Sequence, residues 1–164
     1  MSDSSLVRQT ISHYRVDDLA KTYPEDTILN SYWLPAVLAI KEVNRHNSAR
    51  ALELLRAALP YELGNPLPTV GPLRPVYFRG YALLAAGQAR EAAAEFQKIL
   101  DHRGIVLNSP LGALAHVGLA RAHAASGNNT AARSAYQDFL ALWKDADPDV
   151  PILIQAKAEY AKLH

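Results

Sequence analysis

The apolar and small residues of this chain follow a helical spacing that recurs three times in one register. In each copy a small residue is followed seven positions later by a turn residue. An alanine comes five positions after that, and a large apolar or aromatic residue four further on. The positions are filled by Ala39, His46, Ala51 and Leu55, then by Gly80, Gly87, Ala92 and Phe96, and then by Ala120, Gly127, Ala132 and Tyr136. The copies recur at 41 and 40 residues, which predicts a repeated structural unit.

Each of these positions suits a pair of antiparallel helices. The small residue lets the first helix approach the second, and the alanine lets the second helix lie against its partner. A glycine at the turn can take the left-handed conformation that ends a helix. The large residue fills the space between neighbouring pairs. His46 is a weaker helix end than glycine, and Asn47 beside it is an alternative left-handed residue.

The pattern therefore predicts an all-α chain with three helix pairs, a leading helix and a closing helix. The expected helices cover residues 4–23, 26–45, 48–59, 74–86, 88–102, 110–126, 129–145 and 149–163. Pro35 falls inside the second of these, so that helix either starts near Ser31 or kinks at the proline. Asp149 is the expected N-cap of the last helix. The proline-bearing stretches 60–73 and 102–110 are expected to connect the pairs.

This register of small, glycine, alanine and large residues resembles the tetratricopeptide repeat (TPR). The resemblance implies a right-handed α-solenoid that forms one domain over residues 1–164. Its parts would be a lone helix of a truncated repeat in 1–25, pairs in 26–59, 74–102 and 110–145, and a capping helix in 149–163. The large aromatic residue usual in the first helix of a repeat is missing, and Pro35, Val76 and His116 stand in its place.

Residues 17–164 resemble more closely the C-terminal TPR segment of bacterial serine/threonine protein kinases and related multidomain TPR proteins. The likeness is carried by YPEDTILNSYWLP, PYELG, AEFQKILDHRGIVLNSPLGALAH and YQDFLALWKDADPDVPIL. It implies a role in sensing or assembly beside a catalytic domain. Because the glycine-rich loop and the HRD and DFG motifs are absent from the chain, it implies no kinase activity.

The resemblance also implies a concave groove lined by the first helix of each pair. By register, the groove positions are Trp33, Ile40, Asn44, Arg74, Tyr77, Tyr81, Leu84, Leu114, Val117 and Arg121. We take six of them as candidate partner-binding residues: Trp33, Asn44, Arg74, Tyr77, Tyr81 and Arg121. Trp, Tyr and Arg are enriched at binding hot spots, and arginine binds carboxylates through two hydrogen bonds. The predicted partner is a protein or peptide that carries a carboxylate; the alternative is that the aromatic side chains only pack between helices.

Composition narrows the function classes. The chain has 17 basic and 16 acidic residues, and a balanced charge without basic clusters argues against nucleic acid as a partner. The absence of cysteine excludes disulfides and thiolate zinc sites. The longest apolar run, residues 32–40, is far shorter than the roughly 18 residues that span a membrane. We therefore expect a cytoplasmic protein with no membrane partner and no cofactor.

No motif for catalysis or metal binding is present, so the chain is predicted not to be an enzyme. His116 and His123 are seven residues apart, about 10 Å along a helix, which is too far to chelate one metal ion. We expect both to be satisfied packing residues, and Glu91 and Glu95 beside Lys98 to form a solvated face. One alternative is a small hydrolase-like enzyme that uses His102, His116 or His123 on the groove or a connecting loop. A further alternative is self-association into a homodimer through the N-terminal end of the stack.

Overall fold

The computed structural model describes residues 16–64 and 73–163, and every regular element within them is helical. The elements are α2 (Val16–Thr22), a π-helical turn η1 (Leu29–Trp33), α3 (Leu34–Asn44), α4 (Ser48–Leu55), a 3₁₀ turn η2 (Arg56–Tyr61), α5 (Arg74–Ala85), α6 (Ala89–Asp101), α7 (Arg103–Val106), α8 (Leu111–Ala125), α9 (Asn129–Leu142) and α10 (Pro151–Tyr160). Of the expected helix 4–23, only the part from residue 16 lies within the described residues, and there α2 is helical. Residues 65–72 of the first connector also lie outside them.

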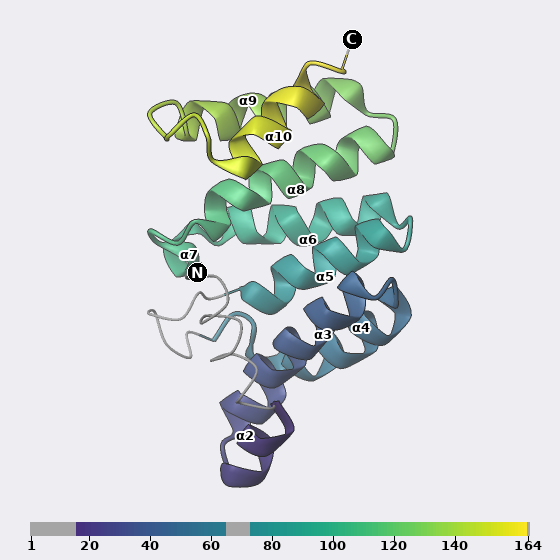
Figure 1. Ribbon diagram of the computed structural model, residues 1–164, viewed down its shortest axis with the longest axis vertical. Coiled ribbons are helices and arrows are strands. Elements are labelled where there is room, and N and C mark those ends of the chain that lie inside the picture. Colours follow the sequence, from purple (N-terminus) through teal and green to yellow (C-terminus); the bar gives the residue numbers. More distant parts are fainter. Residues whose placement is uncertain (1–15, 65–72, 164) are drawn as a thin grey trace, which may run out of the picture.

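The helices form a stack of antiparallel pairs. The hairpins α3–α4, α5–α6 and α8–α9 follow one another along the long axis of the molecule, and α10 packs against α9 at the far end (Figure 1). The first helices also touch one another directly, α3 with α5 and α5 with α8. The all-helical repeat solenoid predicted from the sequence is confirmed.

The three tight turns inside the pairs share one hydrogen-bond pattern. His46, Gly87 and Gly127 all have positive φ, between 61° and 79°. The amide of each turn residue bonds back to the third residue before it, and the next amide bonds to the fifth residue before it, which is a Schellman motif. His46 itself takes the left-handed conformation, so the alternative placement at Asn47 is wrong. Asn47 instead caps α4 by accepting a hydrogen bond from the amide of Arg50.

Pro35 is accommodated without breaking the first helix. The turn before it widens into η1, in which the amide of Leu34 donates to the carbonyl of Leu29, five residues back. The proline then occupies the first turn of α3, where a missing amide hydrogen costs little. The expected start near Ser31 is wrong, because η1 begins at Leu29, and the chain places a π-helical turn directly before the proline.

The connectors contain more helix than expected. The chain after α4 continues as the η2 turn with Pro60 inside it, and the second connector includes the short helix α7. At the last helix the N-cap is Val150, which makes no side-chain cap bond, so the expected cap at Asp149 is wrong. These differences arise because the connectors pack on the stack, and buried contacts can override turn propensity.

The repeated landmark positions form the core. The large residues Leu55, Phe96 and Tyr136 are at most 2% exposed, and the landmark alanines Ala51, Ala92 and Ala132 are fully buried. Phe96 is the central one, because its ring lies against the bare backbones of Gly80 on α5 and Gly118 on α8. A Cβ atom at either glycine would come within 3 Å of the ring. The absence of both side chains is therefore what allows α5, α6 and α8 to meet at Phe96.

Replacing Gly118 with alanine tests this packing. We expect Gly118→Ala to lower the free energy of unfolding by about 1–3 kcal/mol, because the ring is fully buried and cannot swing away from the new methyl group. Chemical denaturation followed by circular dichroism measures the change. Gly104→Ala on α7 is the matched control, since a Cβ atom there meets nothing within 4 Å. Equal stability of the two variants would contradict the packing argument.

Candidate functional site

The six candidate binding residues lie on or just before the first helices of the pairs. Trp33 ends the η1 turn, and Asn44 is the exposed last residue of α3. Arg74, Tyr77 and Tyr81 lie on α5, where Arg74 is exposed and the two tyrosines are partly buried. Arg121 lies on α8 and is also partly buried.

Three of the six are joined in one cluster. The rings of Tyr77 and Tyr81 have centroids 5.0 Å apart, and each ring meets Phe96 edge to face at 5.8 Å. The Tyr81 hydroxyl accepts a hydrogen bond of 2.8 Å from Nη1 of Arg121. We call Tyr77, Tyr81 and Arg121 the aromatic–arginine cluster.

The other three candidates lie elsewhere on these helices. Trp33 directly precedes α3, Arg74 begins α5, and Asn44 ends α3. The Trp33 ring packs edge to face against Tyr32, with centroids 5.0 Å apart. The hydroxyl of Tyr32 accepts a 3.0 Å hydrogen bond from the amide of Leu73, the residue before Arg74. Through Tyr32 the structure thus links Trp33 to the start of α5. Among the described residues no hydrogen bond, ion pair or aromatic ring contact joins Trp33, Arg74 or Asn44 to the aromatic–arginine cluster.

The guanidinium of Arg121 already holds a carboxylate from within the chain. Its Nε and Nη2 donate to the two carboxylate oxygens of Glu159 on α10, at 2.9 and 3.0 Å. The Tyr136 hydroxyl donates to the same carboxylate at 2.6 Å. Burial alone would raise the pKa of Glu159, but the bonds from Arg121 and Tyr136 outweigh it and the pKa is lowered. Arg121 therefore binds a carboxylate through two hydrogen bonds, and that carboxylate is Glu159 of α10.

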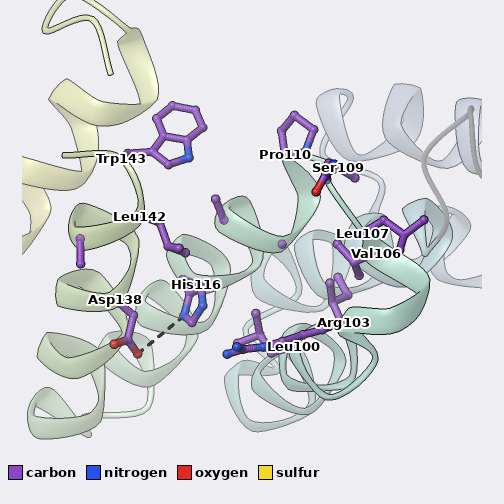
Figure 2. Close-up of a pocket in the computed structure, with 15 residues that line it drawn as sticks. Leu100, Arg103, Val106, Leu107, Ser109, Pro110, His116, Asp138, Leu142 and Trp143 are labelled. Atoms are coloured by element: carbon purple, nitrogen blue, oxygen red, sulfur yellow. Dashed lines mark ion pairs between the residues drawn. The ribbon is translucent and has the colours of Figure 1, made fainter. Parts of the chain in front are cut away.

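A pocket of about 690 Å³ lies at one edge of the stack, where α7 meets the ends of α6, α8 and α9 (Figure 2). Its walls are largely apolar and include Leu100, Val106, Leu142 and Trp143. Its polar lining includes Arg103, Ser109, His116 and Asp138. None of the six candidate binding residues lines it.

His116 is the unusual residue of this pocket. Its side chain is nine-tenths buried, and its Nδ1 atom has no hydrogen-bond partner among the described residues. The nearest carboxylate oxygen, Oδ2 of Asp138, is 3.8 Å away, longer than a hydrogen bond. Burial lowers the pKa of His116 below its ordinary value, and the charge of Arg103 lowers it further while Asp138 acts in the opposite direction. Because its buried Nδ1 has no hydrogen-bond partner among the described residues, the expectation that His116 is a satisfied packing residue is wrong.

One feature of the sequence marks this site. His116 stands where repeats of this kind place a large aromatic residue, and a smaller polar ring there leaves space unfilled. Arg103 and Asp138 carry no such signal, because they come from a connector and from the exposed side of α9. Only the folded chain brings them to His116.

Among the described residues, no hydrogen bond joins the imidazole of His102, His116 or His123, the histidines of the hydrolase alternative, to a side-chain hydroxyl. Nδ1 of His102 lies 2.7 Å from the carbonyl oxygen of Lys98, at the end of α6. The hydroxyl of Ser109, which lines the pocket, accepts a bond from the amide of Leu111. In the described part of the chain no group of three or more histidine or acidic side chains is arranged to hold a metal ion.

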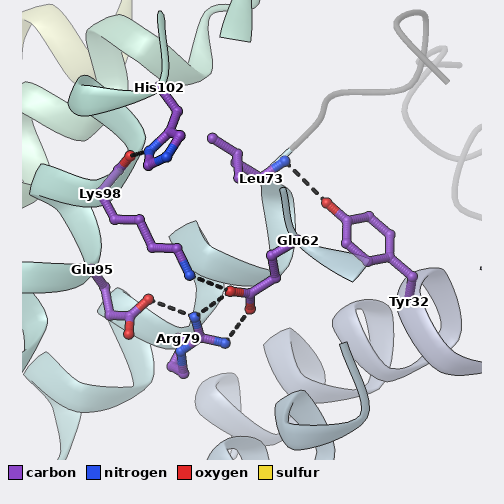
Figure 3. Close-up of polar contacts among 7 residues, drawn as sticks. All are labelled: Tyr32, Glu62, Leu73, Arg79, Glu95, Lys98 and His102. Carbon is purple, nitrogen blue, oxygen red and sulfur yellow. Dashed lines mark hydrogen bonds and ion pairs between the residues drawn. The ribbon is translucent and has the colours of Figure 1, made fainter. Parts of the chain in front are cut away.

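A third polar cluster lies between the first connector and the α5–α6 hairpin (Figure 3). Glu62, only 1% exposed, is ion-paired through both carboxylate oxygens to Arg79 and through one of them to Lys98 at 2.7 Å. Arg79 also bonds Glu95 at 2.6 Å. The expectation of a solvated charged face is therefore wrong for Glu95 and Lys98, whereas Glu91 is exposed. These bonds hold the connector against α5 and α6.

Comparison with known proteins supports the repeat assignment. Residues 77–151 match the family model described as tetratricopeptide repeat, a stretch that includes most of α5 and all of α6 to α9. Tetratricopeptide repeats generally mediate protein–protein interactions. No curated protein and no solved structure matches the chain. Within the described residues, no helix has both the length and the apolar character needed to cross a bilayer.

The Glu62 cluster generates a prediction about pH. Burial would raise the pKa of Glu62, but its bonds to Arg79 and Lys98 lower it instead. The folded chain therefore releases this proton more readily than the unfolded chain. The resulting stability is present above the ordinary glutamate pKa and is lost as the pH falls through the lowered value. We expect Glu62→Gln to lower the free energy of unfolding by about 3 kcal/mol at neutral pH. The difference from wild type should shrink as the pH falls below the ordinary glutamate pKa of 4.5.

Urea denaturation across this pH range measures the effect. Glu91→Gln, which removes an exposed carboxylate from α6, is the control and should follow the wild-type curve. A difference between Glu62→Gln and wild type that stays constant with pH would contradict the assignment.

The bond between Arg121 and Glu159 predicts how α10 is held. We expect Arg121→Ala to loosen α10, because it removes two charge-assisted bonds and leaves the partly buried Glu159 with only Tyr136. The free energy that holds α10 on the stack should fall by about 1.5–3 kcal/mol. In hydrogen exchange followed by mass spectrometry, the variant should exchange faster than wild type in residues 151–160. The increase there should be larger than the increase in α5. Arg90→Ala, an exposed arginine on α6, is the control, and unchanged exchange in α10 would refute the role of Arg121.

Proposed function

We propose that this chain is a protein-interaction module that binds a partner protein or peptide along the face formed by the first helices α3, α5 and α8. The observation that carries the proposal is that the exposed Arg74 and the partly exposed Tyr77 and Tyr81 all lie on α5. Partly exposed tyrosine and arginine side chains of this kind are typical of interface hot spots. The match to tetratricopeptide repeats supports an interaction role, since such stacks use extended concave surfaces.

The two candidate arginines are proposed to act differently. Because Arg121 binds Glu159, its role is to hold the tyrosines and α10 in place. Arg74 is exposed and makes no hydrogen bond or ion pair with the described residues, so it is the arginine that we assign to a carboxylate of the partner. Trp33 packs on the ring of Tyr32, whose hydroxyl bonds the amide of Leu73, and it would contribute apolar contact area to the same partner.

A module of this kind fits the resemblance to the TPR segment of multidomain kinases, in which such a segment serves assembly or sensing. We propose a cytoplasmic setting on the same grounds. The experiment below also distinguishes partner binding from the alternative of self-association through the N-terminal end of the stack.

A peptide-display selection against the wild-type chain tests the proposal. Enriched peptides are expected to carry an acidic or C-terminal carboxylate, and to lose at least about tenfold in affinity with Trp33→Ala or Arg74→Glu. Arg90→Glu reverses the same charge on the exposed side of α6 and should bind as wild type. Circular dichroism confirms that each variant is folded.

Two results would refute this assignment. Peptides that bind all variants equally would place the binding site elsewhere. A concentration-dependent dimer in sedimentation that is lost in Trp33→Ala would mean that this face joins two copies of the chain.

A further inference from the structure

The surface that α10 covers has the form of a seat for a helix. Tyr136 stands at the register position of Phe96, whose ring lies against the backbone of α8, the first helix of the next pair. In the same way α10 packs on α9, and the Tyr136 hydroxyl bonds Glu159 of α10 (Figure 1). α10 therefore takes the place that the first helix of a further pair would take.

The apolar attachment of α10 is small. Among residues 151–160 the buried ones are Leu153 and Ala156, whereas eight residues of α8 are buried. Both belong to the same apolar core as Tyr136 and Phe139 of α9, and Tyr160 packs against that core while partly exposed. Leu153, Ala156 and Tyr160 lie at positions i, i+3 and i+7, which is the spacing by which an amphipathic helix anchors in a groove. α10 is therefore seated in the manner of a bound helix.

Polar bonds supply the rest of the attachment. The carboxylate of Glu159 accepts two bonds from Arg121 and one from Tyr136. The guanidinium of Arg133 lies over the ring of Tyr160, 5.6 Å from its centroid. The side chains of Arg121 and Glu159 are 22% and 35% exposed, so both reach the solvent. A carboxylate from another molecule can therefore form the same two bonds with Arg121.

The position of α10 favours its release. It lies at the end of the solenoid, where an element has a neighbour on one side, and terminal elements open at a lower free energy than central ones. In its connector, none of residues 143–150 is buried. Release of α10 would uncover Tyr136 and Phe139 on α9 and free the guanidinium of Arg121. These groups form an apolar surface beside a carboxylate-binding side chain.

We propose that the surface of α8 and α9 under α10 is a second docking site, and that α10 is its displaceable resident. The partner is an amphipathic helix of another protein. It carries a leucine, a small residue, a glutamate and an aromatic residue with the spacing of Leu153, Ala156, Glu159 and Tyr160. Its glutamate binds Arg121, and its apolar side chains cover Tyr136. The site adjoins the proposed partner face but does not depend on it, because its binding arginine is Arg121 on α8 and not Arg74 on α5.

Fluorescence anisotropy with a labelled peptide of residues 149–163 tests the proposal. In the wild-type chain the tethered α10 competes at a high effective concentration, so the peptide is expected to bind weakly. The full-length variant Leu153→Ala/Glu159→Gln, here called the loosened variant, weakens the resident helix and leaves the seat intact. It should bind the peptide at least about tenfold more tightly than wild type. Addition of Arg121→Ala to the loosened variant should remove that gain.

Three controls separate this seat from other contacts, and circular dichroism confirms that each chain is folded. Ile154→Ala/Lys157→Gln changes two exposed residues of α10 and should bind the peptide as weakly as wild type does. A peptide with Glu159→Gln should bind the loosened variant at least about tenfold more weakly than the unaltered peptide. Addition of Trp33→Ala and Arg74→Glu to the loosened variant should leave peptide binding unchanged, so failure of the partner face and failure of this site can be told apart.

Hydrogen exchange followed by mass spectrometry shows whether the peptide takes the place of α10. With saturating peptide, residues 129–142 of the loosened variant should exchange more slowly, while residues 151–160 of the chain gain no protection. The substituted residues distinguish the chain's own α10 from the added peptide by mass.

The proposal is overturned if the peptide binds the loosened variant no better than wild type, or if the Glu159→Gln peptide binds as well as the unaltered one. Protection of residues 151–160 by the peptide would also overturn it, since α10 would then still be seated. A wild-type dimer in sedimentation that the peptide dissociates would assign the seat to α10 of a second copy, and not to another protein.

Discussion

The contact between the Phe96 ring and the bare backbones of Gly80 and Gly118 is the constraint on which the middle of this molecule depends. It brings three helices from two successive repeats to one side chain. The same ring also makes edge-to-face contacts with Tyr77 and Tyr81. The surface tyrosines are therefore positioned by the core, and a change in the packing of Phe96 would move the proposed binding face with it.

Ion pairs attach the first connector and the last helix to the stack. Glu62 ties the first connector to α5 and α6, and Glu159 ties α10 to α8. In both clusters an arginine binds two acceptors at once, which suits its planar group of donors. A solenoid buries its apolar surface only between neighbouring repeats, so its ends and connectors need such bonds to stay in place.

His116 stands out against this background. The arginines and glutamates of the two clusters have partners, whereas the buried Nδ1 of His116 has none among the described residues. An unpaired buried polar group destabilises the fold by about 1–3 kcal/mol, and such exceptions gather at sites that bind ligands. The position also departs from the repeat pattern, in which a large aromatic residue would fill the same space.

The sequence by itself determined the repeat, its turns and its buried landmarks. These follow from local properties: the spacing of small and large residues along a helix, and the positive φ that Gly87 and Gly127 adopt readily. The pairing of the polar side chains was decided only by the tertiary structure. Arg79 meets Glu62 from 17 residues away and Arg121 meets Glu159 from 38. Which polar groups meet, and which are left facing a pocket as His116 is, depends on the directions of side chains from separate helices, and helical periodicity does not encode those directions.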